Sequence, residues 1–204
     1  MLEQLNNPEL MQNLQKEIPV ITAHIRSVYA ELDKKIHLNG AKYAHYMQYN
    51  YQIPKEIIEK IVEAGTYAAS GMNRQPGIIV AVTNKELRDK LSKMNADIMG
   101  AGMDPFYGAP VVLIVLADKS APTYLYDGSL IMGNLMLAAH ELGIGSCWIH
   151  RAKEEFESEE GKVLLKSLGI TGDYEGIGHC VLGYVDGEYP EIKDRREHTT
   201  FWVE

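Results

Sequence analysis

The pattern of hydrophobic and polar positions is clearest between residues 126 and 150. Apolar side chains recur there at steps of three and four, the period of one helical face. They are Leu130, Ile131, Met132, Leu135, Met136, Leu137, Ala138, Ala139 and Leu142. An apolar arc this wide predicts a helix in the protein interior, with Asp127 as its N-terminal cap and Gly143 at its end. Gly133 inside the helix indicates a close approach to another segment, and Cys147–Ile149 is predicted to form a short buried strand.

The remaining pattern alternates helices with about four strands. Helices are predicted after Pro54, over 85–99 and over 153–168, and strands over 78–82, 111–117 and 178–185. The strand 111–117 is apolar throughout, which is typical of a central strand covered on both faces. This alternation predicts an α/β or α+β fold in a single domain, residues 1–204. Residues 1–38 also show a helical period, whereas the tyrosine-rich stretch 41–52 shows no clear one.

Composition and charge narrow the classes of function. The chain has 204 residues, enough to bury a substantial core in one domain. A net charge of −8 leaves no basic excess for a nucleic-acid partner. No apolar run approaches the roughly 20 residues that cross a bilayer, and the N-terminus has no apolar signal core. Both cysteines fall in apolar segments, so we expect buried thiols, no disulfide and a cytoplasmic protein.

Side chains that could act directly on a substrate are poorly supported. The seven histidines are scattered without metal-ligand spacing to cysteines or carboxylates, so no metal site is predicted. There is no G-x-S-x-G motif, and Cys147 and Cys180 fall in predicted core strands, which argues against nucleophilic catalysis. No G-x-G-x-x-G follows a strand, which argues against a Rossmann nucleotide site.

The 68–76 loop is the best candidate for ligand binding. It offers hydroxyl, amide and guanidinium groups beside a glycine, from Ser70, Gly71, Asn73, Arg74 and Gln75. Such groups suit the imide and carbonyl edge of a flat heteroaromatic ring, although polar surface loops share this composition. A second polar cluster, residues 193–196, either binds an anion such as phosphate or is a solvated run of charge.

Four segments together resemble the nitroreductase family of FMN-dependent oxidoreductases. They are GTYAASGMNRQP, FYGAPVVLIVLAD, DGSLIMGNLMLAAHELGIGSCWIH and VLGYVDGEYPEIKDR, in this order between residues 52 and 204. The resemblance implies an α+β three-layer sandwich, with a mixed, mainly antiparallel central sheet flanked by helices. It also implies an intimate homodimer with FMN at the interface and a C-terminal tail, residues 187–204, that wraps the partner subunit. The implied reaction is ping-pong: NAD(P)H reduces FMN, which then reduces a nitroaromatic, a quinone or a similar small-molecule acceptor.

The resemblance also implies roles for individual residues. The loop that reaches the flavin ring matches Ser70, Asn73 and Gln75. The strand end near the reactive nitrogen of the ring, which acts partly through backbone groups, matches Trp148, Ile149 and His150. The basic residues that hold the FMN phosphate match Lys193 and Arg195. No catalytic side chain is assigned, because the flavin itself carries the chemistry.

The N-terminal segment, residues 1–51, departs from the family pattern. Members carry an Arg-Arg-Ser-x-Arg-like motif that grips the phosphate, but the corresponding positions 43–46 read YAHY. The nearest likeness lies further upstream, which makes Arg26 and Ser27 candidate cofactor contacts in a divergent helical segment. One alternative is therefore a protein with a lost or altered flavin site that acts as a binding or scaffold protein. Another is a flavin enzyme of a different, dehalogenase-like branch.

Overall fold

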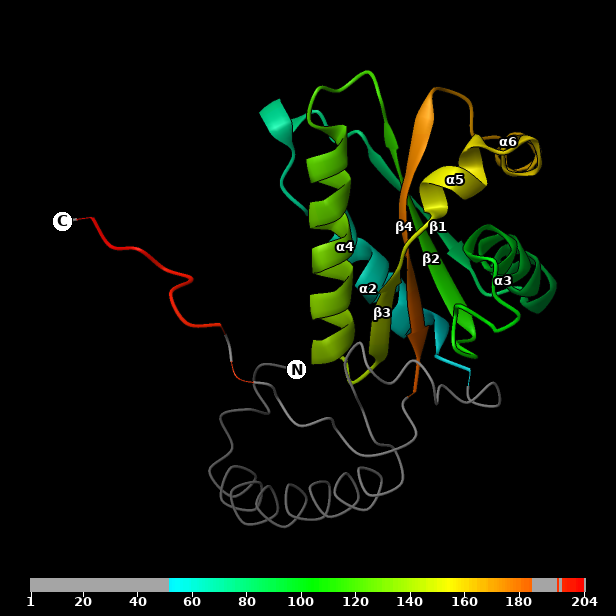
Figure 1. The fold of residues 1–204 in the computed structure, drawn as a ribbon, viewed down its shortest axis with the longest axis horizontal. Coiled ribbons are helices and arrows are strands. Elements are labelled where there is room, and N and C mark those ends of the chain that lie inside the picture. Colours follow the sequence, from blue (N-terminus) through cyan, green and yellow to red (C-terminus); the bar gives the residue numbers. More distant parts are fainter. Residues whose placement is uncertain (1–51, 185–193, 195, 204) are drawn as a thin grey trace, which may run out of the picture. The chain divides into compact units, whose positions relative to one another are not determined.

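The computed structural model describes residues 52–184, 194 and 196–203. Within them the elements follow in the order α2 (Lys55–Thr66), η3 (Gly71–Asn73), β1 (Gly77–Val82), α3 (Lys85–Met99), β2 (Val111–Asp118), α4 (Tyr124–Glu141), β3 (Gly145–Ile149), α5 (Ala152–Glu157), α6 (Glu159–Ser167) and β4 (Tyr174–Gly183) (Figure 1). The predicted helix over 85–99 and the strand over 111–117 are confirmed closely. The predicted strand over 178–185 begins earlier, at Tyr174. The N-terminal segment 1–51 lies outside the described residues.

The four described strands form one sheet in the order β1-β2-β4-β3, and each of its three pairings is antiparallel. On one side of β2, Ile114 lies opposite Val80 of β1. On the other side, Leu113 of β2 lies opposite Cys180 of β4. A register shift between Val115 and Leu116 bends the β2–β4 ladder. Every residue from 111 to 117 is buried, as predicted for a strand covered on both faces.

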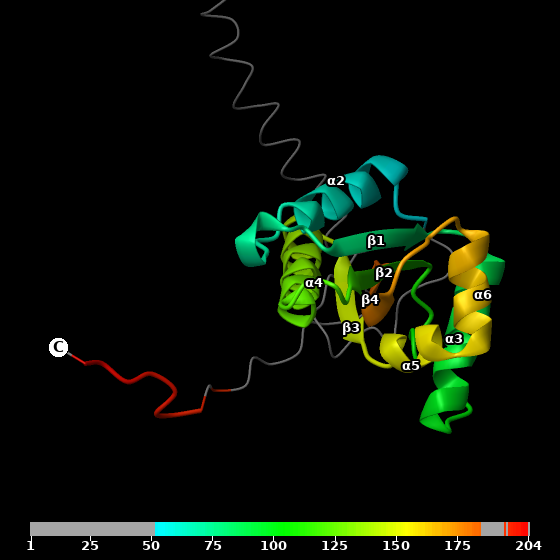
Figure 2. The same cartoon turned by 90° about the horizontal axis from the view of Figure 1, so that it is seen from above.

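The helices cover both faces of the sheet and so form three layers (Figure 2). Alternate residues of β2 divide between two cores, since side chains along a strand point to opposite faces. Val112 and Ile114 pack in the core with α3, α5 and α6, whereas Leu113 and Val115 pack with α2 and α4. This helix–sheet–helix sandwich confirms the predicted α+β class.

Helix α4 differs from the predicted central helix. It begins at Tyr124, so Asp127 lies inside its first turns and does not cap it. No atom of the described residues comes within 4 Å of a Cβ added to Gly133, so the predicted close approach is not made there. Met132 and Leu135 face the sheet and are fully buried. The opposite face exposes the apolar side chains of Tyr126, Leu130 and Leu137. The helix therefore forms an outer layer with an apolar outer face.

The predicted helix over 153–168 is two helices, α5 and α6, which meet at Ser158. Ser158 has an extended backbone (φ −67°, ψ 155°), and its hydroxyl accepts the Gly161 N–H at 3.0 Å as the cap of α6. A Cβ on Gly161 would lie 2.0 Å from the Glu155 carbonyl oxygen, so only glycine allows this close contact. The break at Ser158 was not predicted because charged residues on both sides of it continue the polar pattern of a single exposed helix.

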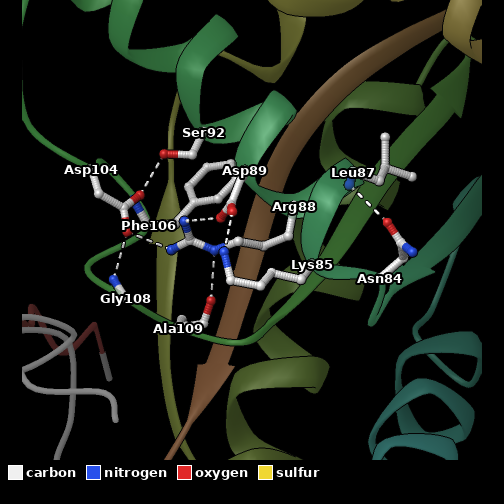
Figure 3. Close-up of polar contacts among 10 residues, drawn as sticks. All are labelled: Asn84, Lys85, Leu87, Arg88, Asp89, Ser92, Asp104, Phe106, Gly108 and Ala109. Carbon is white, nitrogen blue, oxygen red and sulfur yellow. Dashed lines mark hydrogen bonds and ion pairs between the residues drawn. The ribbon is translucent and has the colours of Figure 1, made fainter. Parts of the chain in front are cut away.

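Arg88 anchors α3 to the loop that precedes β2 (Figure 3). Its side chain is almost fully buried and donates from Nε to the Ala109 carbonyl at 2.8 Å and from Nη2 to the Asp104 carboxylate. Asp104 also accepts the Ser92 hydroxyl and, at 2.7 Å, the Gly108 N–H. Charge-assisted hydrogen bonds of this kind are shorter and stronger than neutral ones, so they hold the loop firmly against α3.

Both cysteines are buried and form no disulfide, as predicted. Burial raises the pKa of the Cys147 thiol and, more strongly, that of Cys180, so neither is a reactive thiolate at neutral pH. Among the described helices, none has the length and apolar character needed to span a bilayer. Within the same residues, no three side chains of His, Cys, Asp or Glu gather as a metal site.

Candidate functional site

The 68–76 loop has a strained backbone. Met72, Asn73 and Gln75 all adopt positive φ, between 50° and 55°, a region that costs non-glycine residues roughly 1–2 kcal/mol each. Local hydrogen bonds hold this conformation. The Ser70 hydroxyl accepts the Gln75 N–H at 3.0 Å, and the Gln75 side-chain amide donates to Asn73 Oδ1 at 3.0 Å. Strain that the surroundings maintain is typical of ligand clamps, so the loop is a candidate binding element.

Asp127 ties this loop to the start of α4. Its carboxylate is buried and accepts the Gly71 N–H at 2.9 Å and the Thr123 hydroxyl at 2.8 Å. A Cβ on Gly71 would lie 2.3 Å from Thr123 Oγ1, so the close contact requires glycine. The residue expected to cap α4 instead fixes the candidate binding loop, because the helix begins one turn earlier than its sequence indicates.

A hollow of about 420 Å³ lies beside the loop. Its apolar lining includes Val62 of α2, Ile79 of β1 and Ile131 of α4, together with Ala68 of the loop. Ser70, Gln75 and Asp127 supply the polar part of the lining. An apolar hollow with a few polar groups on one side is typical of sites for flat organic ligands.

The end of β3 places the second predicted group, Trp148, Ile149 and His150. Trp148 packs on the α2–α4 side of the sheet, against Gly178, where a Cβ would lie 2.3 Å from Trp148 Nε1. Ile149 is buried on the opposite side, and His150 is exposed at the strand end. The His150 carbonyl accepts the Asn95 amide at 2.8 Å, which fixes the backbone of this turn.

The structure shows no direct hydrogen bond between the two predicted groups within the described part of the chain. The loop lies at the N-terminal end of α4, whereas β3 follows the C-terminal end of the same helix (Figure 1). Among the described residues, no hydrogen bond links Ser70, Asn73 or Gln75 to the 148–150 segment. Four further predicted contacts lie outside the described residues, namely Arg26, Ser27, Lys193 and Arg195.

Sequence reasoning missed a buried polar cluster next to the His150 turn. Glu155 and His179 are fully buried with Oε2 and Nε2 3.0 Å apart, and Asn95 donates to the other Glu155 oxygen. Glu155 stands in a run of charged residues that is typical of a solvated helix. His179 stands alone in an apolar strand, and that isolation is the one signal the sequence carries.

Replacing Asp127 with alanine should release the loop. We expect the free energy of unfolding to fall by about 2–4 kcal/mol, because two hydrogen bonds to a buried carboxylate are lost. Amide exchange at Gly71 should accelerate at least tenfold. The matched control is Asp118→Ala, which removes a carboxylate that accepts one exposed backbone N–H, from Ser120. Unchanged protection at Gly71 in Asp127→Ala would contradict the anchoring role.

Comparison with known proteins agrees with this fold. The model of the nitroreductase family matches residues 48–102 and 97–184, and the chain therefore belongs to the nitroreductase family. A protein of Archaeoglobus fulgidus named "Putative NADH dehydrogenase/NAD(P)H nitroreductase" is 34% identical over 162 residues, which cover 74% of this chain and 88% of the relative. A Methanothermobacter thermautotrophicus protein of the same name is 28% identical over 132 residues, 63% of this chain and 66% of the relative.

Among solved structures, a Bacteroides fragilis nitroreductase with bound FMN superposes with a TM-score of 0.71. It is 27% identical, and the match covers 78% of this chain and 92% of that one. A Desulfitobacterium hafniense nitroreductase with bound FMN gives a TM-score of 0.67 at the same identity and coverage.

Proposed function

We propose that this protein is an FMN-dependent oxidoreductase that uses NAD(P)H to reduce nitroaromatic, quinone or similar small-molecule acceptors in a ping-pong reaction. The observation that carries the proposal is the strained polar loop, held by Asp127 beside an apolar hollow, in a chain of the nitroreductase family. The names of the relatives, which include NAD(P)H nitroreductase, support the choice of co-substrate. The buried thiols and the acidic chain fit a cytoplasmic protein without a nucleic-acid partner.

The residues of the loop suit the polar edge of a flavin ring. Within the described residues, Asn73 Nδ2 and Gln75 Oε1 have no protein partner, so one donor and one acceptor remain available to a ligand. Lys193 and Arg195, with Arg26 and Ser27, are proposed to hold the phosphate. FMN, when bound, supplies the hydride chemistry. The chain then contributes binding and orientation, and the backbone at His150 contributes fixed dipoles near the ring.

We further propose that the working unit is a homodimer. Among the described residues, no hydrogen bond links the two predicted ring-contacting groups within one chain, and we propose that one cofactor meets the loop of one subunit and the β3 end of the other. The outer face of α4 exposes apolar side chains, and Gly133 on this helix has open space around it. The exposed side chains of Phe201, Trp202 and Val203 fit a tail, 187–204, that packs on the partner subunit.

The first experiment is an absorbance spectrum after FMN is added to the purified protein and unbound FMN is removed. We expect the visible bands of oxidised flavin to remain, to bleach when NAD(P)H is added without oxygen, and to return when a nitroaromatic or quinone follows. A variant with Asn73→Ala and Gln75→Ala should bind FMN about tenfold more weakly, because two neutral hydrogen bonds are lost. Asn84→Ala, which removes an exposed amide from the start of α3, is the control. A protein that releases all added FMN would overturn the proposal.

A further inference from the structure

The turn after β3 is held in an unfavourable conformation. Arg151 is a non-glycine residue with φ 77° and ψ 8°, in the left-handed region. Asn95 of α3 contacts both sides of this residue. Its Nδ2 donates to the His150 carbonyl at 2.8 Å, and its Oδ1 accepts Arg151 Nε at 3.0 Å. One buried amide therefore determines the orientation of the peptide that joins His150 to Arg151.

Asn95 is itself held by a second layer of buried groups. Its Nδ2 also donates to Glu155 of α5, and the other carboxylate oxygen of Glu155 lies 3.0 Å from His179 Nε2 on β4. Asn95, Glu155 and His179 are all fully buried. The His179 ring packs near two aromatic rings, with centroid distances of 5.2 Å to Phe106 and 6.1 Å to Phe156. The position of the amide is thus set by three different elements.

Burying these polar groups has a cost that packing alone does not explain. A carboxylate and an imidazole in a dry core require partners, and apolar side chains of similar volume would fill this space at least as stably. The hydrogen-bonded chain ends at His150, an exposed residue at the end of β3. His179 Nδ1 has no hydrogen-bond partner among the described residues, so the connected part of the network runs from His179 Nε2 through Glu155 and Asn95 to the peptide 150–151. Buried hydrogen bonds of this kind restrict the groups that they join to one arrangement.

We propose that Asn95, oriented by Glu155 and His179, is a positioning residue that fixes the 150–151 peptide against the reactive edge of the flavin. This inference rests on the proposed function. A strained peptide held from behind can present its dipole in one direction without reorganisation, which is the condition for stabilising charge that develops on a bound ring. Asn95 does not touch the cofactor in this arrangement and acts only through the turn.

The direct test is the midpoint potential of bound FMN in Asn95→Ala. Loss of the fixed dipole should weaken binding of reduced FMN about tenfold relative to oxidised FMN, which lowers the potential by about 30 mV. We expect kcat to fall about tenfold while the KM for the acceptor changes less than twofold. Ser92→Ala is the matched control, because Ser92 is a buried, hydrogen-bonded side chain on the same helix that faces Asp104 instead. An unchanged potential in Asn95→Ala would overturn the inference.

A second pair of variants keeps Asn95, Glu155 and His179 in place, and both members of the pair lose the same Arg151 Nε donor to Asn95. Arg151→Ala and Arg151→Gly both remove the guanidinium, but only glycine adopts positive φ without strain. If the orientation of the turn matters, Arg151→Ala should lower the potential and Arg151→Gly should keep the wild-type value. Equal potentials in the two variants would contradict the role of the turn. A wild-type protein that binds no FMN would instead refute the proposed function, so the two failures are distinct.

Discussion

Replacing Arg88 with methionine is expected to lower the free energy of unfolding by about 3–5 kcal/mol. The guanidinium is almost fully buried and pairs with Asp104, so its loss leaves a carboxylate without its cationic partner. The buried Ala109 carbonyl also loses the Nε donor, and an unsatisfied buried group adds its own penalty. Methionine fills much of the space of the arginine stem, so the effect reports the charge and hydrogen bonds rather than a cavity.

Urea unfolding at neutral pH measures this change. The control is Lys93→Met on the same helix, which removes an ion pair with Asp97 that is largely exposed to solvent. Exposed pairs contribute little to stability, so we expect a far smaller loss for Lys93→Met. Equal losses in the two variants would show that Arg88 does not anchor the loop. A change in the slope of the unfolding curve would instead indicate an altered unfolded state.

The same anchor predicts a dependence on pH. Burial alone would raise the pKa of Asp104, but hydrogen bonds from Arg88, Ser92 and the Gly108 N–H, together with the charge of Arg88, lower it below its usual value. A carboxyl group with a lowered pKa in the folded state stabilises the protein above its unfolded pKa of about 4, and this contribution is lost as pH falls through the folded value. In Asp104→Asn, the free energy of unfolding should therefore fall less steeply than in the wild type as the pH is lowered from about 5 to about 2, the range in which such carboxyl groups titrate.

Replacing Leu137 with glutamate is expected to convert the proposed dimer into monomers. The Leu137 side chain is 71% exposed on the outer face of α4, one helical stripe with Leu130. In a dimer that buries this face, an unpaired carboxylate would lose its hydration, a cost that exceeds the energy of the apolar contacts around it. Because each cofactor is proposed to contact both subunits, FMN affinity should fall at least tenfold together with dimerisation.

Light scattering across a range of protein concentrations measures the dimer, and flavin retention after desalting measures the cofactor. The matched control is Val163→Glu on α6, whose side chain is 66% exposed on the other helical layer. That variant should remain a dimer with full FMN. Retention of dimer and cofactor in Leu137→Glu would place the interface elsewhere. Unfolding of the isolated subunit should change little in either variant, because both positions are exposed.

The local elements of this protein follow from the sequence by itself. The apolar run 111–117 predicted a strand buried on both faces, and the amphipathic period over 85–99 predicted the extent of α3. Such patterns are determined by neighbouring residues, so they need no knowledge of the rest of the chain. The family motifs likewise predicted a binding role for the 68–76 loop, although periodicity could not reveal its left-handed backbone.

Only the tertiary structure decided which polar groups work together. The amide of Asn95 meets Glu155 across 60 positions of sequence, and Asp127 meets Gly71 across 56. From the sequence alone, Glu155 is predicted to be solvated and Asp127 to cap a helix, because the hydrogen-bond partner of each lies on an element distant in the sequence. The exposure of the outer face of α4 was also decided by the tertiary structure. The spacing of apolar residues along a helix does not show which of its faces the sheet will bury. Local pattern thus determined the elements, and long-range packing determined the site.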